Sequence, residues 1–545
     1  MKKQLLTLIL FQLVASLSYS QNTIGTVLNT EDAYNGYTLF TSANETYLIN
    51  NCGEVINQWT STFPPGNAVY LLEDGSLLRA CRINNPNFNF GGSGGRIEKY
   101  NWEGNLIWEY DYSSTTILQH HDVFPMPNGN VLVLAVTEMT NAQAIQAGRN
   151  PALLTEGTLY NEQVVELQPV GSNNATIVWQ WDAKDHLIQD FDITKNNFGV
   201  VENSPERLDV NFLNGGGGNK NWLHVNSMQY DAALDQIVLS SRNLSELWII
   251  DHSTTTQEAA SSLGGTYGKG GDFLYRWGNP QAYKQGTEVD RKLFGQHYPH
   301  FIPNGLLDAG KIIIFNNGNG RTPLYSEVDI INPPTTSPGV YTYTPNTAYG
   351  PIAPDFIYSD LSNTPSDFYS AIVSSAQRLP NDNILICEGR DGRFFEIDDT
   401  NSIVWEYVNP VDTNNGFIHT QGDHPTTNLT FRAIKYAPDY PAFTGRDLTP
   451  GNPIELNPDL SDCNNLGVTD LSISNLKIYP NPTTSFVTIN STSIIDKIDV
   501  YNLLGSKIHT TTNTNTLDLS KYNSGIYTLK IHSGNQYVNK KIIKH

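Results

Sequence analysis

Short runs of alternating apolar and polar residues, separated by turn-forming residues, recur along most of the chain. HHDVFPMPNGNVLVLA, residues 120–135, is an example, with alternating residues on both sides of Asn128-Gly129. A period of two indicates strands with one buried face, and Asn-Gly between two such runs indicates a β-hairpin. The pattern therefore predicts an all-β protein.

One strand pattern, V-W-x-Y/W or a looser relative, appears six times. Hairpins with turns such as Asp74-Gly75 and Asn304-Gly305 follow the copies, which are Val55–Trp59, Leu106–Tyr110, Ile177–Trp181, Phe273–Trp277, Phe356–Asp360 and Ile403–Tyr407. Four short strands per unit, repeated six times, predict a six-bladed β-propeller. A solenoid is the alternative, but long uneven insertions and the absence of capping units favour a closed ring.

The hairpin turns give these strands a common register. The residue seven positions before each turn residue is always polar, and we call these six positions the ring stations: Asn67, His121, His224, His297, Ser374 and Arg432. Equal offset along a strand means equal height, and equal parity means the same face. We assign these strands to the lining of the channel and predict that the stations form a ring at one mouth. Three of the six are histidine in a chain with only 12 histidines.

An arginine joins this ring by antiparallel pairing. In the hairpin 224–242, Arg242 lies as far after the midpoint, Ala233, as His224 lies before it. The returning strand should therefore bring Arg242 to the level of His224. A guanidinium beside three histidines suits a tetrahedral oxyanion. A zinc site is the alternative, but Arg242 argues against a bound cation, and we predict neither a metal nor another cofactor.

The remaining histidines are interpreted as structural. His120 is one residue out of register and should point away from the channel, and His300 should lie on the opposite face. His186 and His252 receive the same interpretation. His419 and His424 lie in a loop from which they could reach the channel mouth.

The N-terminus has the pattern of a secretory signal, predicted over residues 1–20. Lys2 and Lys3 precede an apolar run that is too short to span a membrane, and Ser18-Tyr19-Ser20 offers a cleavage site. Export permits disulfides, and among three possible pairings we favour Cys52 with Cys463 as a hypothesis. The net charge of −21 argues against nucleic-acid binding and against a basic membrane surface.

The sequence pattern changes near residue 460. We predict a propeller over 21–451, a linker over 452–470 and a small β-sandwich over 471–545. The last part resembles the C-terminal sorting domain of the type IX secretion pathway, in the residues Tyr479-Pro480-Asn481-Pro482, Val500-Tyr501-Asn502, Gly525-Ile526-Tyr527 and Lys540-Lys541. The resemblance implies the type IX machinery as a partner and a secreted or surface-located protein. An adhesion module is the alternative.

Several stretches of the propeller resemble the arylsulfate sulfotransferase family. They are His121-Asp122 with Pro127-Asn128-Gly129-Asn130, Trp222 to Ser227, Ser240-Ser241-Arg242 to Glu246, Gly295-Gln296-His297, Gln377 to Asn381, and Phe431-Arg432-Ala433. The resemblance covers about residues 36 to 445. It implies a six-bladed propeller that moves sulfuryl groups between phenols without a nucleotide donor.

The resemblance also implies roles for residues. His297 would be the nucleophile that becomes sulfurylated, and His121 and His224 the other functional histidines. Arg242 and Asn226 would hold sulfuryl oxygens. From the ring we predict that Asn67, Ser374 and Arg432 also bind substrate. Tyr298 departs from the family, in which aspartate often follows the nucleophile.

Two other functions remain open from the sequence. A hydrolase of aryl sulfates would use water in place of the acceptor phenol, and product analysis would separate it from a transferase. A non-catalytic binding propeller at the cell surface would also be exported and acidic, because the fold alone implies no function. Such a protein would have no need of the histidine ring.

Overall fold

The computed structural model describes residues 22–545 apart from 216–218, 363–365, 461–462, 464–476, 492–494, 503–506, 513 and 534–535. It divides into two compact units, Met1–Leu460 and Ser461–His545. The predicted signal, 1–20, and residues 461–462 and 464–470 of the predicted linker lie outside the described residues. The predicted domain limits stay predictions.

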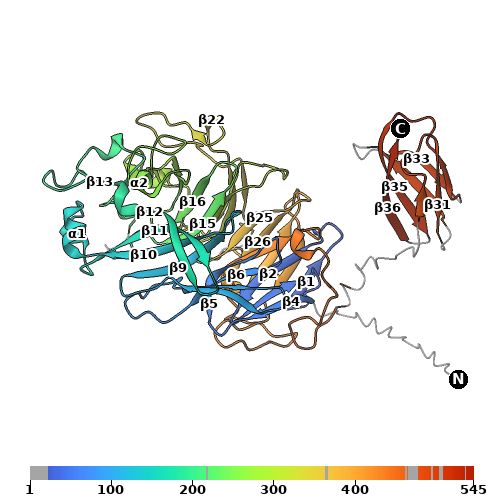
Figure 1. Ribbon diagram of the computed structural model, residues 1–545, viewed down its shortest axis with the longest axis horizontal. Coiled ribbons are helices and arrows are strands. Elements are labelled where there is room, and N and C mark those ends of the chain that lie inside the picture. Colours follow the sequence, from blue (N-terminus) through green and yellow to red (C-terminus); the bar gives the residue numbers. More distant parts are fainter. Residues whose placement is uncertain are drawn as a thin grey trace, which may run out of the picture. The chain divides into compact units, whose positions relative to one another are not determined.

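Six antiparallel sheets of at least four strands make up the first unit (Figure 1). The first sheet contains β5 (Pro65–Leu71), β6 (Leu77–Arg82), β7 (Gly95–Tyr100) and β8 (Leu106–Asp111), and the second contains β9 (Ile117–Pro125), β10 (Val131–Met139), β11 (Leu159–Val170) and β12 (Asn174–Asp182). The third sheet contains β15 (Val225–Asp231), β16 (Gln236–Ser241), β17 (Glu246–Asp251) and β18 (Tyr275–Trp277). The fourth sheet contains β19 (His297–Phe301), β20 (Ile312–Asn316), β21 (Glu327–Ile331) and β24 (Phe356–Tyr358).

The other two sheets contain strands from both ends of the unit. The fifth sheet has β25 (Ser375–Arg378), β26 (Ile384–Glu388), β27 (Arg393–Ile397) and β28 (Ile403–Val408), extended by β1 (Gly25–Asn29). The sixth begins with β29 (Ala433–Tyr436) and continues with β2 (Tyr37–Ser42), β3 (Glu45–Ile49) and β4 (Val55–Thr60). Each V-W-x-Y copy is the fourth strand of its sheet.

The sheets contact one another in a closed cycle. Along the first strands, β5 contacts β9, β9 contacts β15, β15 contacts β19, β19 contacts β25 and β25 contacts β29, and β2 then contacts β5. The predicted all-β propeller architecture is confirmed in this ring of sheets. The strands before the counted turns are the first strands of their sheets, as predicted.

One detail of the prediction is wrong. The stretch that begins at Arg432 was expected to form a sixth hairpin, but β29 pairs with β2, from Tyr37 opposite Tyr436 to Phe40 opposite Ala433. The second strand of this sheet comes from the N-terminal part of the unit, so pairing between strands far apart in sequence closes the ring. The count still found Arg432, because β29 occupies the first position of its sheet.

The tryptophans explain why the V-W-x-Y strand recurs. In five sheets a tryptophan of the fourth strand donates its indole N–H to a backbone carbonyl near the fourth strand of the next sheet, namely Trp59 to Asn101, Trp108 to Asn174, Trp181 to Gly271, Trp277 to Pro351 and Trp405 to Asn51. All five side chains are buried. A buried indole needs a partner for its N–H, so the same residue fills the gap between two sheets and ties them together.

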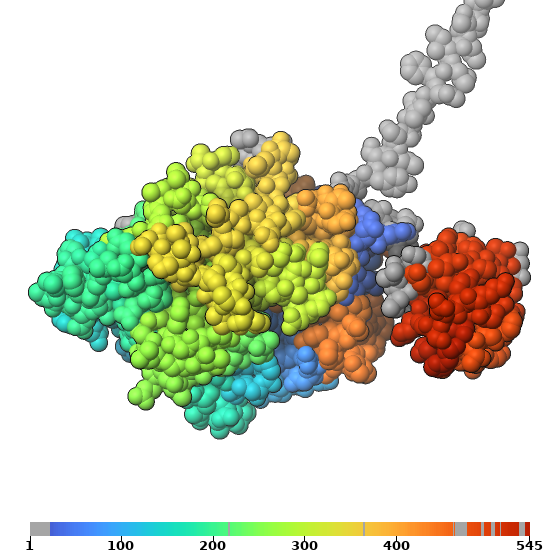
Figure 2. All heavy atoms as spheres, turned by 90° about the horizontal axis from the view of Figure 1, so that it is seen from above, coloured from blue at the N-terminus to red at the C-terminus, as the bar shows by residue number. Residues whose placement is uncertain are grey.

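Helices are short and belong to connections, with α1 (Asn141–Gln146) between β10 and β11 and α2 (Thr256–Ala259) between β17 and β18. The long connection from β21 to β24 includes β22 (Thr335–Ser337) and β23 (Val340–Tyr341) and lies at the surface, yellow in Figure 2. A two-stranded pair, β13 (Leu187–Ile188) and β14 (Leu208–Asp209), follows β12. In the described part of the chain no helix is long and apolar enough to cross a membrane.

The second unit has two sheets around its own core. One contains β30 (Lys477–Tyr479), β31 (Phe486–Asn490) and β34 (Thr516–Asp518), and the other contains β32 (Lys497–Tyr501), β33 (Lys507–Thr512), β35 (Gly525–Ser533) and β36 (Gln536–Lys544). Val487, Val500 and Leu529 are fully buried between them. This matches the predicted small β-sandwich.

The cysteines fall into two kinds. Cys52 and Cys463 are disulfide-bonded, and they are the two that the sequence hypothesis paired. Cys81 and Cys387 are buried free thiols. Burial raises the pKa of Cys81 to about 12, so this thiol stays protonated and unreactive at neutral pH.

Candidate active site

Four ring stations, His224, His297, Ser374 and Arg432, are the first residue of their first strand or the residue before it, and Asn67 and His121 lie within β5 and β9. In five of the sheets the backbone is left-handed at the station or just after it, with positive φ at Asn67, His121, His224, Tyr298 and Ser374. The pairing register shifts at this point in four first strands, β5, β9, β15 and β19. Bulges of this kind re-aim side chains, and strained backbone gathers at functional sites.

His297, the first residue of β19, is held by an amide. Its Nδ1 lies 2.7 Å from Oδ1 of Asn317. The amide nitrogen of Asn317 donates to the carbonyls of Ser370 and Val373, at 2.6 and 2.9 Å. Because the amide nitrogen is occupied, the oxygen must face His297 and accept the Nδ1 proton. Nε2 of neutral His297 is therefore left with a free lone pair.

His121 is backed by a second histidine and a carboxylate. Nδ1 of His120 lies 2.8 Å from Nδ1 of His121, and Nε2 of His120 lies 2.9 Å from Oε2 of Glu162. A carboxylate only accepts, so His120 donates from Nε2 to Glu162, and the tautomer with its proton there accepts through Nδ1. His121 then donates from Nδ1, and its Nε2 has a free lone pair. All three side chains are buried.

The interpretation of His120 as a structural residue did not include its contact with His121. A bulge lies at this point, since His121 has a φ of 51° and the register with β10 shifts between Val133 and Ala135. An extra residue in a strand breaks the simple alternation of faces, and the direction of His120 relative to the channel stays a prediction. Sequence reasoning also missed Glu162 and Asn317, because only the paired strands bring them beside the histidines.

His224 lies against His121. The two ring centroids are 4.8 Å apart at an interplanar angle of 73°. The side-chain amide of Asn221 donates to Nδ1 of His224 at 2.8 Å. In this arrangement neutral His224 carries its proton on Nε2. The pair therefore presents one nitrogen acceptor, on His121, and one N–H donor, on His224.

Arg242 returns to the level of His224, as the hairpin count predicted. Its backbone N–H donates to the carbonyl of His224 at 3.1 Å. In the described part of the chain no carboxylate lies within salt-bridge distance of its guanidinium. Burial lowers the pKa of Arg242, and Tyr369 opposes this shift. An uncompensated cation in a half-buried position is suited to a bound anion.

The three histidines share one electrostatic environment. Burial, followed by His224, His120, His297 and Arg242, lowers the pKa of His121 well below its usual range. Burial and then Arg242 do the same for His224, and they lower the pKa of His297 to about 3. The empty site at neutral pH thus contains neutral imidazoles beside one guanidinium.

Other predicted site residues have local partners. Arg432 forms a salt bridge with Asp122 at 2.8 Å and lies over the ring of Tyr298, 3.8 Å from its centroid. The amide of Asn226 donates to the carbonyl of Gln296 at 2.8 Å, and its Oδ1 is buried without a partner. The charge of Arg432 is therefore balanced inside the protein, unlike that of Arg242.

The ring stations Ser374 and Asn67 differ in what surrounds their side chains. The hydroxyl of Ser374 lies 2.9 Å from that of Ser370 and accepts from the backbone N–H of Gly389 at 3.0 Å. Asn67 is half-buried and lines a cavity beside the ring. Ser374 thus supports neighbouring backbone, while Asn67 faces space that a ligand can occupy.

The histidines outside the ring pair elsewhere. His186 lies 2.7 Å from Asp272, and His252 lies between Asp235 and Glu166 at 2.7 and 3.1 Å. His300 contacts the carbonyl of Tyr298, and His419 contacts Asp423 of its own loop. Within the residues that the structure describes, no group of three or more histidine, cysteine or acidic side chains is arranged to hold a metal ion.

The fold and site define a propeller-like ring of sheets with an uncompensated guanidinium beside three neutral histidines at one end of its first strands. The chain belongs to the arylsulfotransferase (ASST) family, whose model matches residues 38–432. Residues 477–545 match the secretion system C-terminal sorting domain, which indicates type IX export to the cell surface or beyond. A search of curated proteins found no match.

The solved structures to which this chain is similar are distant. A protein of unknown function from Bacteroides caccae is 10% identical, with a TM-score of 0.39, over 74% of this chain and 98% of that one. A periplasmic gluconolactonase from Pseudomonas aeruginosa is 10% identical, with a TM-score of 0.34, over 74% and 99%. An inactive virginiamycin B lyase from Staphylococcus aureus is 10% identical, with a TM-score of 0.31, over 71% and 88%. Such distant likenesses carry no functional argument.

Proposed function

We propose that the protein transfers a sulfuryl group from an aryl sulfate to a phenolic acceptor in two steps, through a sulfurylated His297. Membership of the family supports aryl sulfotransferase activity in general. The observation that carries the finer proposal is the hydrogen bond from His297 to Asn317, because it leaves the Nε2 lone pair free. A pKa of about 3 keeps that lone pair available at neutral pH.

In the first step Nε2 of His297 attacks sulfur. An N–S bond forms, the bond between sulfur and the aryl oxygen breaks in line, and the phenolate leaves with the electron pair. Sulfuryl transfer resembles phosphoryl transfer, in which charge spreads over the three equatorial oxygens. Arg242 and the Nε2–H of His224 are the donors that would hold those oxygens.

His121 would act as the general acid and then as the general base. A bound sulfate ester brings negative charge, which raises the pKa of His121 and favours protonation of its Nε2. That proton goes to the departing phenolate. In the second step the acceptor phenol gives its proton to Nε2 of His121, and its oxygen attacks the sulfuryl group. His120 and Glu162 would stabilise the positive charge on His121 while it is protonated.

The other residues would position this machinery. Asn226 holds the carbonyl of Gln296 and so fixes the backbone just before His297. The salt bridge between Arg432, just before β29, and Asp122, the residue after His121, ties β29 to β9. We therefore propose that Asn226, Arg432 and Ser374 support the ring from behind, and that Asn67 contacts substrate.

Hydrolysis of the same donors is the second candidate. His121 and His297 are each only 4% exposed. Low exposure limits the access of bulk water to the two reacting groups, so transfer to a bound phenol is favoured. Phenol release that does not rise with added acceptor would favour hydrolysis.

Intact-protein mass spectrometry tests the proposal. After incubation with 4-nitrophenyl sulfate, the wild type should gain the mass of one SO₃ group, and peptide mapping should place it on His297. The adduct should disappear when phenol is added. His297→Asn should gain none. Equal turnover of donor by the wild type and His297→Asn would overturn the mechanism.

A further inference from the structure

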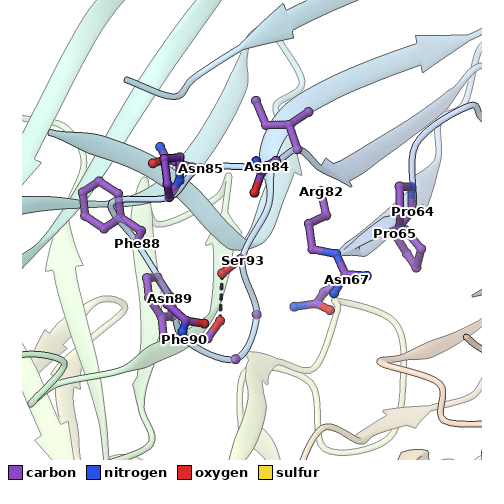
Figure 3. A pocket seen from close by; sticks show the side chains of 14 residues that line it. Pro64, Pro65, Asn67, Arg82, Asn84, Asn85, Phe88, Asn89, Phe90 and Ser93 are labelled. Carbon is purple, nitrogen blue, oxygen red and sulfur yellow. Dashed lines mark hydrogen bonds between the residues drawn. The ribbon is translucent and has the colours of Figure 1, made fainter. Parts of the chain in front are cut away.

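A cavity of about 680 Å³ opens beside ring station Asn67 (Figure 3). Its walls are the start of β5, the end of β6 and the connection 83–93 between β6 and β7. A volume of this order accommodates a ligand much larger than one phenol ring.

The wall of this cavity also lies against His121 and His224. Gly92 lines the cavity, and a side chain there would collide with Nε2 of His121. Phe90 lines it too, with its ring centroid 6.3 Å from that of His224 and 5.4 Å from that of His120. A molecule that reaches His121 with its reacting group therefore has this cavity next to it.

The cavity is polar, and none of its lining residues is acidic. Arg82 is exposed at its edge, and in the described residues its guanidinium has neither a carboxylate nor another hydrogen-bond partner. The side-chain amides of Asn67, Asn84 and Asn89 also have no hydrogen-bond partner among the described residues. They line the same cavity (Figure 3). In a chain with a net charge of −21, a cavity with a free cation and no carboxylate is suited to an anionic group.

Arg82 occupies the same place in its sheet as Arg242 does in another. Arg82 ends β6, and its backbone N–H donates to the carbonyl of Pro64, the residue before β5, at 2.8 Å. Arg242 follows β16, and its backbone N–H donates to His224, the residue before β15, at 3.1 Å. The repeat therefore sets two uncompensated guanidinium groups at the same end of their sheets.

We infer that this cavity is a subsite for a second anionic group on the phenolic substrate. Arg82 binds the carboxylate or sulfate of that group, the asparagine amides bind neighbouring oxygens, and Phe90 contacts the aromatic part. The substrate class is an acidic phenol larger than phenol itself. The inference rests on the proposed transferase function for the identity of the aromatic part.

Paired acceptors test the subsite in turnover. With 4-nitrophenyl sulfate as donor at fixed ionic strength, 4-hydroxyphenylacetate should have a kcat/KM about tenfold above that of its neutral amide. Arg82→Gln should bring this ratio to about one, and Arg82→Lys should restore part of it. Arg390→Gln is the matched control, because Arg390 is also exposed, lies in the equivalent connection after β26 and does not line the cavity. It should keep the ratio.

Direct binding separates the subsite from the reaction. Calorimetry on full-length His297→Asn should give a lower Kd for the acid than for the amide, and adding Arg82→Gln should remove the difference. If no variant transfers sulfate, the proposed function fails, and this binding difference alone decides the subsite. The inference would be overturned if the wild type showed no preference for the acid over the amide, or if this preference survived Arg82→Gln. An equal loss of the preference in Arg390→Gln would also overturn it.

Discussion

Nδ1 of His297 lies 2.7 Å from Oδ1 of Asn317, a contact that joins the first residue of β19 to the residue that follows β20. Two carbonyls hold the other end of the amide. The contact therefore fixes both the rotation of the imidazole and the nitrogen that carries its proton.

Asn317→Asp should move the acid limb of the pH–rate profile. A carboxylate beside His297 raises the pKa of this histidine from about 3, so the neutral nucleophile is lost at higher pH as the solution is acidified. The expected result is a limb in kcat/KM between about pH 5 and 7 that the wild type lacks. Asn105→Asp, an equal charge change in an exposed turn, should keep the wild-type profile.

Glu162→Gln should make kcat/KM depend more steeply on the basicity of the leaving phenolate. Without the carboxylate, the positive charge on His121 and His120 is less stabilised, so departure of a basic phenolate suffers most. We expect kcat/KM for phenyl sulfate to fall about 10- to 100-fold and that for 4-nitrophenyl sulfate to fall much less.

Glu166→Gln is the control for this variant, because Glu166 lies in the same strand, β11, and contacts His252 instead. It should leave the ratio between the two donors unchanged. Equal losses with both donors in Glu162→Gln would contradict the assignment of the acid–base role to His121.

Donor binding should take up a proton. The pKa values of His121 and His224 lie well below their usual range in the empty site, and the negative charge of the donor raises them. Between the free and bound pKa values the complex holds more protons than the free protein. Calorimetry of aryl sulfate binding to His297→Asn at pH 6, in buffers of different ionisation enthalpy, should show the uptake. Identical heats in all buffers would exclude it.

His252 should stabilise the protein mainly at acidic pH. Burial lowers its pKa, but hydrogen bonds and ion pairs with Glu166 and Asp235 outweigh this and raise it above 6.5. A raised folded-state pKa gives stability that is present below 6.5 and lost as the pH rises through the folded value. His252→Gln should therefore lower Tm more at pH 5.5 than at pH 9 in calorimetric scans. An equal decrease at both would indicate lost packing alone.

Much of this site could be predicted because its residues repeat at a fixed distance from a turn. His121, His224 and His297 share one offset, and Arg242 follows from antiparallel pairing. The roles of their partners could not be predicted in this way. The contact of His120 with His121 forms at a bulge in β9, and that of Glu162 with His120 depends on the pairing of β11 with β10. Arg432 had the right position, but its balance by Asp122 depends on contacts between strands far apart in sequence.

The pairing of β29 with β2 has a consequence for when the protein becomes active. Until residues 433–436 have been made and have found residues 37–40, the sixth sheet lacks its first strand and Asp122 lacks Arg432. Contacts between such distant segments form late, because the entropy of closing a long loop opposes them. We therefore expect a chain that ends before residue 433 to lack the assembled candidate site.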